Sequence, residues 1–144
     1  MRKRKGLDCI LLIDDEEINN YLNFALIKKL KIDVHIEIAL NGKLGLEYLT
    51  CTGKYENNKC FPQPGLIFLD INMPLMNGWE FLAEYEKLNE NQKGQHVIVM
   101  LSASSNPDDI NRANSKSDLV GFINKPLTIQ KLEEIIYKYF PYDD

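Results

Sequence analysis

Leu66-Ile67-Phe68-Leu69-Asp70 is a run of four apolar residues that ends in a carboxylate. Apolar residues at every position, rather than at alternate positions, are typical of a strand whose two faces are both buried. Residues 8–13 and 96–101 are two further runs that are mostly apolar. The first is followed by Asp14-Asp15 and the second by Ser102. The sequence therefore predicts three strands in the interior of a sheet, each with a polar side chain near its carboxyl end.

Two further strands and five helices are expected around these runs. Residues 34–39 alternate like a second strand, and residues 119–123 form a short fifth one. A first helix is predicted from an apolar stripe with the helical period, which consists of Ile18, Leu22, Ala25, Leu26 and Leu30. The side chains expected to cap the later helices are Asn41, Asn77 (with Glu80 completing a capping box), Asn106 and Thr128.

Strand and helix thus alternate along the whole chain. Strands that are apolar throughout belong to a parallel sheet with helices on both faces, and right-handed crossovers leave few ways to wind such a sheet. We predict an α/β fold: a doubly wound five-stranded parallel sheet flanked by five helices, flavodoxin-like, with strand order 2-1-3-4-5.

The composition is that of a globular protein, and residues 1–144 are expected to form a single domain. The formal net charge of −4 disfavours nucleic acid as the main partner. No apolar run approaches the ~20 residues that cross a bilayer, and no signal-peptide core follows the basic start. We therefore expect no membrane association and a cytoplasmic location. Residues 1–6 are expected to be a solvated basic tail, and the polar residues 52–64 an extended loop.

The three cysteines form an odd number without metal-ligand spacing. Cys9 lies inside an apolar run and is expected to be a small core residue. Cys51 and Cys60 flank the polar loop and could approach one another, but the sequence does not require a bridge between them. A reducing cytoplasm is the simplest assignment.

The polar side chains that follow the strands are expected to meet in space. Asp14-Asp15, Asp70, Ser102 and Lys125 each follow or nearly follow an apolar strand. The carboxyl ends of parallel strands lie at one edge of the sheet, where open α/β sheets bind their ligands. Three carboxylates so close would repel one another unless a cation intervenes. Mg²⁺, which takes few carboxylates together with waters and a phosphate, fits this group.

With such an ion present, the group could accept a phosphoryl group. Asp70 can act as a nucleophile toward phosphorus, since carboxylates form aspartyl-phosphate intermediates. Lys125 would add positive charge beside the transferred group, and the Ser102 hydroxyl could donate a hydrogen bond to it.

These residues also carry a family resemblance. Four separated motifs together resemble the receiver domain of two-component response regulators: Leu12-Ile13-Asp14-Asp15-Glu16, Leu69-Asp70-Ile71-Asn72-Met73-Pro74 with Gly78, Leu101-Ser102-Ala103, and Lys125-Pro126. The match covers nearly the whole chain, in order and with suitable spacings. The resemblance implies a phosphoacceptor switch, not an enzyme acting on external substrates, in which Asp70 receives a phosphoryl group from a phosphohistidine donor.

The resemblance also implies roles for the neighbouring residues. Asp15 and the backbone carbonyl of Asn72 would join Asp70 as Mg²⁺ ligands, with Asp14 holding a metal-bound water. Phe122 matches the aromatic switch residue, which would follow Ser102 when Ser102 moves toward the phosphoryl group. Lys125-Pro126 matches the usual cis-peptide site.

Partners follow from the same resemblance. The phosphodonor would be a sensor histidine kinase or a histidine phosphotransfer protein. Because the chain ends soon after its last predicted helix, the output is expected to be contact with an unidentified downstream protein. Residues 114–118 depart from the small apolar residues that the family often has before the fifth strand.

Three other interpretations are weaker on chemical grounds. An aspartate-nucleophile phosphohydrolase would need a second aspartate as acid and base where this chain has Asn72. A flavin-binding electron carrier would need a hydroxyl- and glycine-rich loop where Asp14-Asp15-Glu16-Glu17 would repel a phosphate. A receiver that only docks would not need the intact acidic group with Ser102 and Lys125. His35 and His96 lack metal-ligand partners and are expected to be structural.

Overall fold

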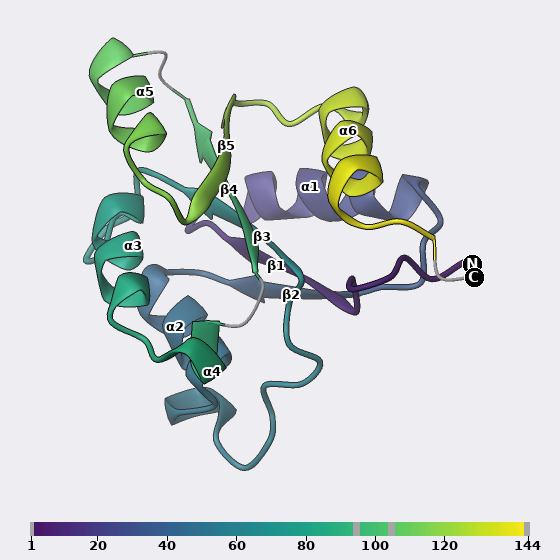
Figure 1. The fold of residues 1–144 in the computed structure, drawn as a ribbon, viewed down its shortest axis with the longest axis horizontal. Coiled ribbons are helices and arrows are strands. Elements are labelled where there is room, and N and C mark those ends of the chain that lie inside the picture. Colours follow the sequence, from purple (N-terminus) through teal and green to yellow (C-terminus); the bar gives the residue numbers. More distant parts are fainter. Residues whose placement is uncertain (1, 94–95, 104–105, 143–144) are drawn as a thin grey trace.

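The fold is a parallel five-stranded sheet with helices on both faces (Figure 1). In the computed structural model, which describes residues 2–93, 96–103 and 106–142, the strand order is β2-β1-β3-β4-β5, as predicted. The strands are β1 (Cys9–Ile13), β2 (His35–Ala39), β3 (Leu66–Asp70), β4 (Val97–Ser102) and β5 (Leu119–Asn124). Every residue of β1 and β3 is buried, which confirms that these strands are covered on both faces.

Six α-helices, not five, occur among the described residues. They are α1 (Glu17–Lys29), α2 (Gly42–Thr50), α3 (Gly78–Glu86), α4 (Glu90–Lys93), α5 (Pro107–Asn114) and α6 (Ile129–Tyr139), with a 3-10 turn η1 (Gly53–Tyr55) after α2. The unexpected helix is α4, which has four residues. It forms because Asn89 and Gln92 cap one another: the Gln92 backbone N–H donates to Asn89 Oδ1 (2.9 Å) and the Asn89 N–H to Gln92 Oε1 (3.2 Å).

Alternate strand residues build two separate cores. Leu11, Ile13, Ile67 and Leu69 point to one face, where they pack with buried residues of α2 and α3. Ile10, Leu12, Leu66 and Phe68 point to the other face and pack with residues of α1 and α6.

The predicted helix caps are present. The Asn41 side chain accepts from the Leu44 N–H, the Thr128 side chain from the Lys131 N–H, and the Asn106 side chain from the Asp108 N–H. Asn77 and Glu80 form the full capping box at the start of α3. Each cap satisfies a backbone donor that the first helical turn leaves free.

The predicted apolar face of α1 is right toward its C-terminal end, where Leu26 and Leu30 pack against the core, and wrong at its start. Ile18 and Leu22 are 74% and 52% exposed, whereas the buried positions are Asn20, Asn23 and Ile27. The physical reason lies at the start of the helix, where the Asn20 side chain turns inward and donates to the Asp14 carbonyl oxygen (2.9 Å). A polar anchor therefore fixes the rotation of α1, and the start of the apolar stripe is displaced toward solvent.

Among the described residues at the start of the chain, Arg2, Lys3, Lys5 and Gly6 are exposed, as expected of a solvated tail, but Arg4 is not. Arg4 is buried, and its guanidinium lies 3.9 Å from the centre of the Tyr142 ring. The Lys5 N–H donates to the Pro141 carbonyl oxygen (2.6 Å), so the two ends of the chain run together. A guanidinium can stack on aromatic rings while its aliphatic stem is buried, which lets a basic segment pack instead of remaining in water.

The polar segment after α2 is closed by a disulfide between Cys51 and Cys60. We call residues 51–60 the disulfide loop. Within it, Tyr55 is buried and packs edge-on against Tyr48 of α2, with 4.9 Å between ring centres. The segment is a loop, as expected, but it is folded back on the domain. Within the described part of the chain, no helix has both the length and the apolar character that crossing a membrane requires.

Candidate functional site

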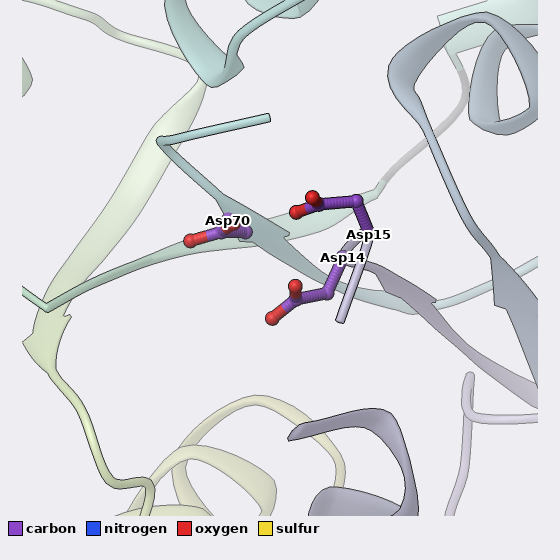
Figure 2. Close-up of side chains that lie close together, drawn as sticks. All are labelled: Asp14, Asp15 and Asp70. Atoms are coloured by element: carbon purple, nitrogen blue, oxygen red, sulfur yellow. The ribbon is translucent and has the colours of Figure 1, made fainter. Parts of the chain in front are cut away.

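Three aspartates meet at the carboxyl edge of the sheet. Asp14 and Asp15 follow β1, and Asp70 ends the neighbouring strand β3; the register pairs Ile13 with Leu69. Figure 2 shows the three side chains gathered at this edge, and one oxygen from each carboxylate lies within 4.8 Å of the others. Asp14 and Asp70 are each only 3% exposed. Burial in this group concentrates negative charge where water can screen it least.

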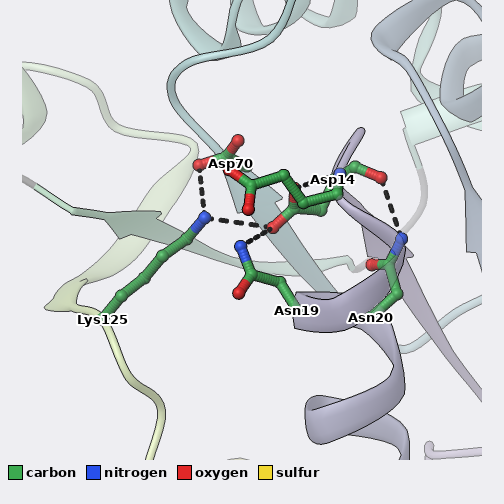
Figure 3. A network of polar contacts seen from close by, with 6 residues as sticks. Asp14, Asn19, Asn20, Asp70 and Lys125 are labelled. Atoms are coloured by element: carbon green, nitrogen blue, oxygen red, sulfur yellow. Dashed lines mark hydrogen bonds and ion pairs between the residues drawn. The ribbon is translucent and has the colours of Figure 1, made fainter.

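Lys125 brings a positive charge to this edge from the end of β5. Its Nζ lies 2.9 Å from Asp70 Oδ1 and 3.1 Å from Asp14 Oδ2 (Figure 3). The Lys125 backbone N–H donates to the Ser102 carbonyl oxygen (2.7 Å), which ties the turn after β5 to the end of β4. The Lys125–Pro126 peptide bond is cis. One ammonium group thus bridges two carboxylates that come from different strands.

The charges in the group perturb one another. Burial raises the pKa of Asp70, and the Asp14 carboxylate adds to that rise, although the hydrogen bond from Lys125 opposes it. For Lys125, burial alone would lower the pKa, but the hydrogen bonds and attraction to Asp70 and Asp14 outweigh burial and raise it. Lys125 therefore stays an ammonium group at neutral pH.

Two asparagines of α1 hold Asp14 in place. Besides the Asn20 bond to the Asp14 backbone, Asn19 Nδ2 donates to Asp14 Oδ2 (3.4 Å) (Figure 3). The Glu16 backbone N–H donates to Asp14 Oδ1 (2.9 Å). Neither asparagine was predicted from the sequence. The available signal was their place in the first turn of a helix that directly follows the acidic pair, where a side chain can reach back to the strand end.

The donor set suits a hard divalent cation. Asp15 Oδ1 is shielded from solvent and has no hydrogen-bond partner among the described residues. A buried carboxylate oxygen without a partner is costly. Three carboxylates against one ammonium group leave two negative charges uncompensated within the group. Oxygen ligands of this kind are those that Mg²⁺ and Ca²⁺ prefer.

The remaining predicted site residues lie at different distances from this group. Asn72 follows Asp70 by two residues, and its backbone N–H opposes the rise in the pKa of the Asp70 carboxyl. Ser102 is fully buried at the end of β4, the strand next to β3. Phe122 lies within β5, opposite Met100, and packs half-buried on the core. The structure brings Asp14, Asp15, Asp70 and Lys125 into one cluster, with Ser102 at the same edge and Phe122 farther along its own strand.

Gly78 lets α3 begin against the end of β3. Its N–H donates to the Ile71 carbonyl oxygen (2.7 Å), and a Cβ added to Gly78 would lie 2.8 Å from the Asp70 carbonyl oxygen. Any side chain at this position would push the backbone of Asp70. Position 78 of the sequence motif therefore requires glycine on steric grounds.

Comparisons with known proteins point in one direction. The model of the response regulator receiver domain matches residues 10–137. Response regulator Rcp1 from Synechocystis is 38% identical over 101 residues, which cover 70% of this chain and 65% of Rcp1. Hybrid signal transduction histidine kinase G from Dictyostelium discoideum is 30% identical over 92% of this chain but only 4% of the kinase. The chain thus spans less than two thirds of these relatives.

Two solved structures support the same assignment. A two-component response regulator from Cytophaga hutchinsonii is 30% identical, with a TM-score of 0.77, over 94% of this chain and 98% of that one. The Mn(2+)-bound form of response regulator Rcp1 is 29% identical, with a TM-score of 0.72, over 91% of this chain and 90% of that one.

Proposed function

Because this chain belongs to the response regulator receiver family of two-component signalling, we propose that Asp70 is its phosphoryl-accepting residue. The protein acts as a signalling switch, not as a classical enzyme. The observation that carries the proposal is the contact of the Lys125 ammonium with Asp70, at 2.9 Å, inside a cluster of three carboxylates. Of the three, Asp70 is the one that ends β3 at the centre of the sheet.

The transfer step follows from this geometry. One oxygen of the Asp70 carboxylate attacks the phosphorus of a phosphohistidine donor, the N–P bond breaks, and the donor imidazole leaves with the electron pair. The product is an acyl phosphate on Asp70. Lys125 is anchored at the end of β5. Its ammonium group would leave its contact with Asp14 and stabilise the negative oxygens of the transferred group.

Asp14, Asp15, Asp70 and the backbone carbonyl of Asn72 are the groups that would hold Mg²⁺. When bound, the ion would neutralise charge on the phosphoryl oxygens. The orphaned Asp15 Oδ1 supports this assignment, because it supplies a ligand atom that no described residue uses. Asn19 and Asn20 keep the Asp14 carboxylate and backbone in place for the same purpose.

The signal leaves the site through Ser102 and Phe122. Ser102 is buried at the end of β4, beside the strand that carries Asp70, so its hydroxyl can turn toward an added phosphoryl group. Phe122 is half-buried and lines a hollow of about 150 Å³ with residues of α5 and β5, which leaves space beside its ring. The face around α5, β5 and α6 would change shape and bind another protein differently.

The phosphodonor that we propose is a sensor histidine kinase or a histidine phosphotransfer protein. We also propose that this protein acts in the cytoplasm. The relatives among hybrid histidine kinases support the donor class, since each contains a segment similar to this chain. The downstream protein is defined only by what it must do, which is to distinguish the phosphorylated face from the unphosphorylated one.

The proposal is tested by intact-mass spectrometry after incubation with acetyl phosphate, with and without Mg²⁺. We expect one phosphoryl adduct that needs both Mg²⁺ and Asp70. Asp70→Asn removes the nucleophile, and Asp8→Asn is the matched control because Asp8 lies at the opposite end of β1 in an exposed ion pair with Lys3. An adduct of equal yield on Asp70→Asn would overturn the assignment.

A further inference from the structure

A second chemical feature lies at the opposite edge of the sheet from Asp70. Cys51 is the C-cap that directly follows α2, and Cys60 precedes β3; their Cα atoms are 5.2 Å apart and their sulfurs are bonded. We propose that Cys51–Cys60 is a reversible redox site, which takes a small-molecule thiol or disulfide such as glutathione and which opens and closes the disulfide loop. This input would be independent of phosphorylation.

The two sulfurs differ in their access to solvent. Cys60 is fully buried within the core. Cys51 is only half-buried and, with Phe61 and Gln63, lines a cavity of about 510 Å³ beside α4. A small thiolate can therefore reach Cys51 Sγ but not Cys60 Sγ, and accessibility decides which sulfur is attacked.

The exchange proceeds in two balanced steps. The thiolate attacks Cys51 Sγ, the Cys51–Cys60 bond breaks, and Cys60 leaves as a thiolate that takes up a proton. A second small thiolate then attacks the small-molecule sulfur of the mixed disulfide, the bond to Cys51 Sγ breaks, and Cys51 leaves as a thiolate that takes up a proton, so the small-molecule disulfide is released. The protein disulfide gains two electrons, two small thiols are oxidised, and oxidised glutathione drives the same steps backward.

The contacts around the loop indicate which part opens. The side after Cys60 is held without the disulfide, because the Tyr48 hydroxyl donates to the Pro62 carbonyl oxygen (2.7 Å) and Gln63 Nε2 donates to the Tyr48 carbonyl oxygen (2.9 Å). Residues 52–59 are held by Glu47, whose backbone carbonyl accepts from the Thr52 N–H and whose carboxylate accepts from the Lys54 N–H. A contact between the Thr50 and Thr52 hydroxyls (2.8 Å) and the packing of Tyr55 on Tyr48 add to this hold. When the bond between the two sides is broken, residues 52–59 should lift away first.

Opening would uncover a stack of side chains that ends at the third cysteine. Tyr55 of the loop packs on Tyr48, and the Tyr48 hydroxyl lies 3.9 Å from the sulfur of Cys9 in β1. Cys9 is fully buried, and burial raises the pKa of its thiol to about 12. Cys9 is therefore a natural reporter, because it stays unreactive for as long as this stack is closed.

The decisive comparison uses two proteins in which Cys9 is the remaining free thiol: the oxidised wild type and the Cys51→Ser/Cys60→Ser variant. Alkylation of Cys9 by iodoacetamide is followed by intact mass. We expect the rate to be at least fivefold higher in the variant, and trypsin to cut after Lys54 and Lys59 faster there. Equal rates of tryptic cleavage after Lys54 and Lys59 in the two proteins, together with equal alkylation rates, would show that the disulfide does not control the loop.

Two further measurements test whether the double variant is still folded at the Asp70 site and which of the two cysteine sulfurs exchanges with glutathione. Acetyl phosphate should label Asp70 at the same rate in both proteins, within twofold; loss of labelling in the variant would mean that the two edges are not independent. With oxidised glutathione, Cys60→Ser, which leaves Cys51 free, should gain a glutathione adduct at least tenfold faster than Cys51→Ser. The reverse order would overturn attack at Cys51.

Discussion

Lys125 Nζ lies 2.9 Å from Asp70 Oδ1, although Lys125 lies in the turn after β5 and Asp70 lies at the end of β3. The strand between them in the sheet is β4, whose Ser102 carbonyl oxygen accepts from the Lys125 backbone N–H. The contact therefore depends on the whole carboxyl edge being assembled, and it links the charge of the nucleophile to the position of β5.

Replacing Lys125 with methionine, which has a similar length and no charge, should slow phosphorylation of Asp70 by acetyl phosphate at least tenfold. The reason is that the attacking carboxylate and the phosphoryl oxygens lose their positioned cation, a loss of more than about 1.4 kcal/mol in the transition state. The rate is measured by intact mass over time. Lys131→Met, on the exposed side of α6, is the control, and similar rates for both variants would argue against a role for Lys125.

Asp15→Asn should weaken Mg²⁺ binding about tenfold or more, because it removes one negative charge and turns an acceptor oxygen into an amide. Isothermal titration calorimetry measures the affinity directly and does not depend on phosphorylation. Asp8→Asn should bind Mg²⁺ as the wild type does. If Asp15→Asn bound the ion equally well, Asp15 would not be a ligand.

The sequence predicted the fold and the site cluster because both depend on local, repeated signals. The apolar strands and the capping residues Asn41, Asn77 and Thr128 are short-range patterns, and each is present in the structure. The meeting of Asp14, Asp15, Asp70 and Lys125 then follows from parallel strand topology, which puts all carboxyl ends at one edge.

The features that sequence did not predict depend on contacts between distant segments. The place of Asn20 in the first turn after the acidic pair allows it to reach back to the Asp14 carbonyl, but it does not indicate that Asn20 is buried there and that Ile18 and Leu22 are turned toward solvent. The approach of Cys51 and Cys60 requires the loop to fold back, and the packing of Arg4 requires the tyrosines near the end of the chain. Such contacts are decided by tertiary packing, which overrides local propensity.

His96 should make the protein less stable in mild acid. Its Nδ1 lies 2.8 Å from the oxygen of the Tyr85 hydroxyl. Because that hydroxyl donates its hydrogen to the Lys93 carbonyl oxygen, the His96 Nδ1–H is the donor to the Tyr85 oxygen. Burial lowers the pKa of His96 from 6.5 to about 4.

The sign of the effect follows from proton linkage. Between pH 6.5 and 4 the unfolded chain binds a proton on His96 that the folded chain does not, so stability falls as the pH falls through this window, by roughly 3 kcal/mol at most. Urea unfolding of the wild type and of His96→Gln at several pH values measures the difference. A pH dependence that is the same in both proteins would exclude His96 as its source.

Arg4→Ala should lower the free energy of unfolding by about 1–2 kcal/mol. The Arg4 guanidinium lies 3.9 Å from the Tyr142 ring centre and 4.8 Å from that of Tyr137, and the side chain is buried. Urea denaturation tests this, with Lys3→Ala as the control, because the exposed Lys3–Asp8 pair should contribute little. Equal losses in the two variants would mean that the packed arginine adds no stability of its own.

The position of the phosphoryl group on Asp70 can be determined chemically. Borohydride converts an aspartyl phosphate into homoserine, so reduction of the protein labelled with acetyl phosphate and Mg²⁺, followed by peptide sequencing in a mass spectrometer, locates the modified residue. We predict homoserine at position 70 and unchanged aspartate at positions 14 and 15. Homoserine at either of those positions, or a borohydride-stable phosphate on Ser102, would contradict the assignment of Asp70 as the phosphoryl acceptor.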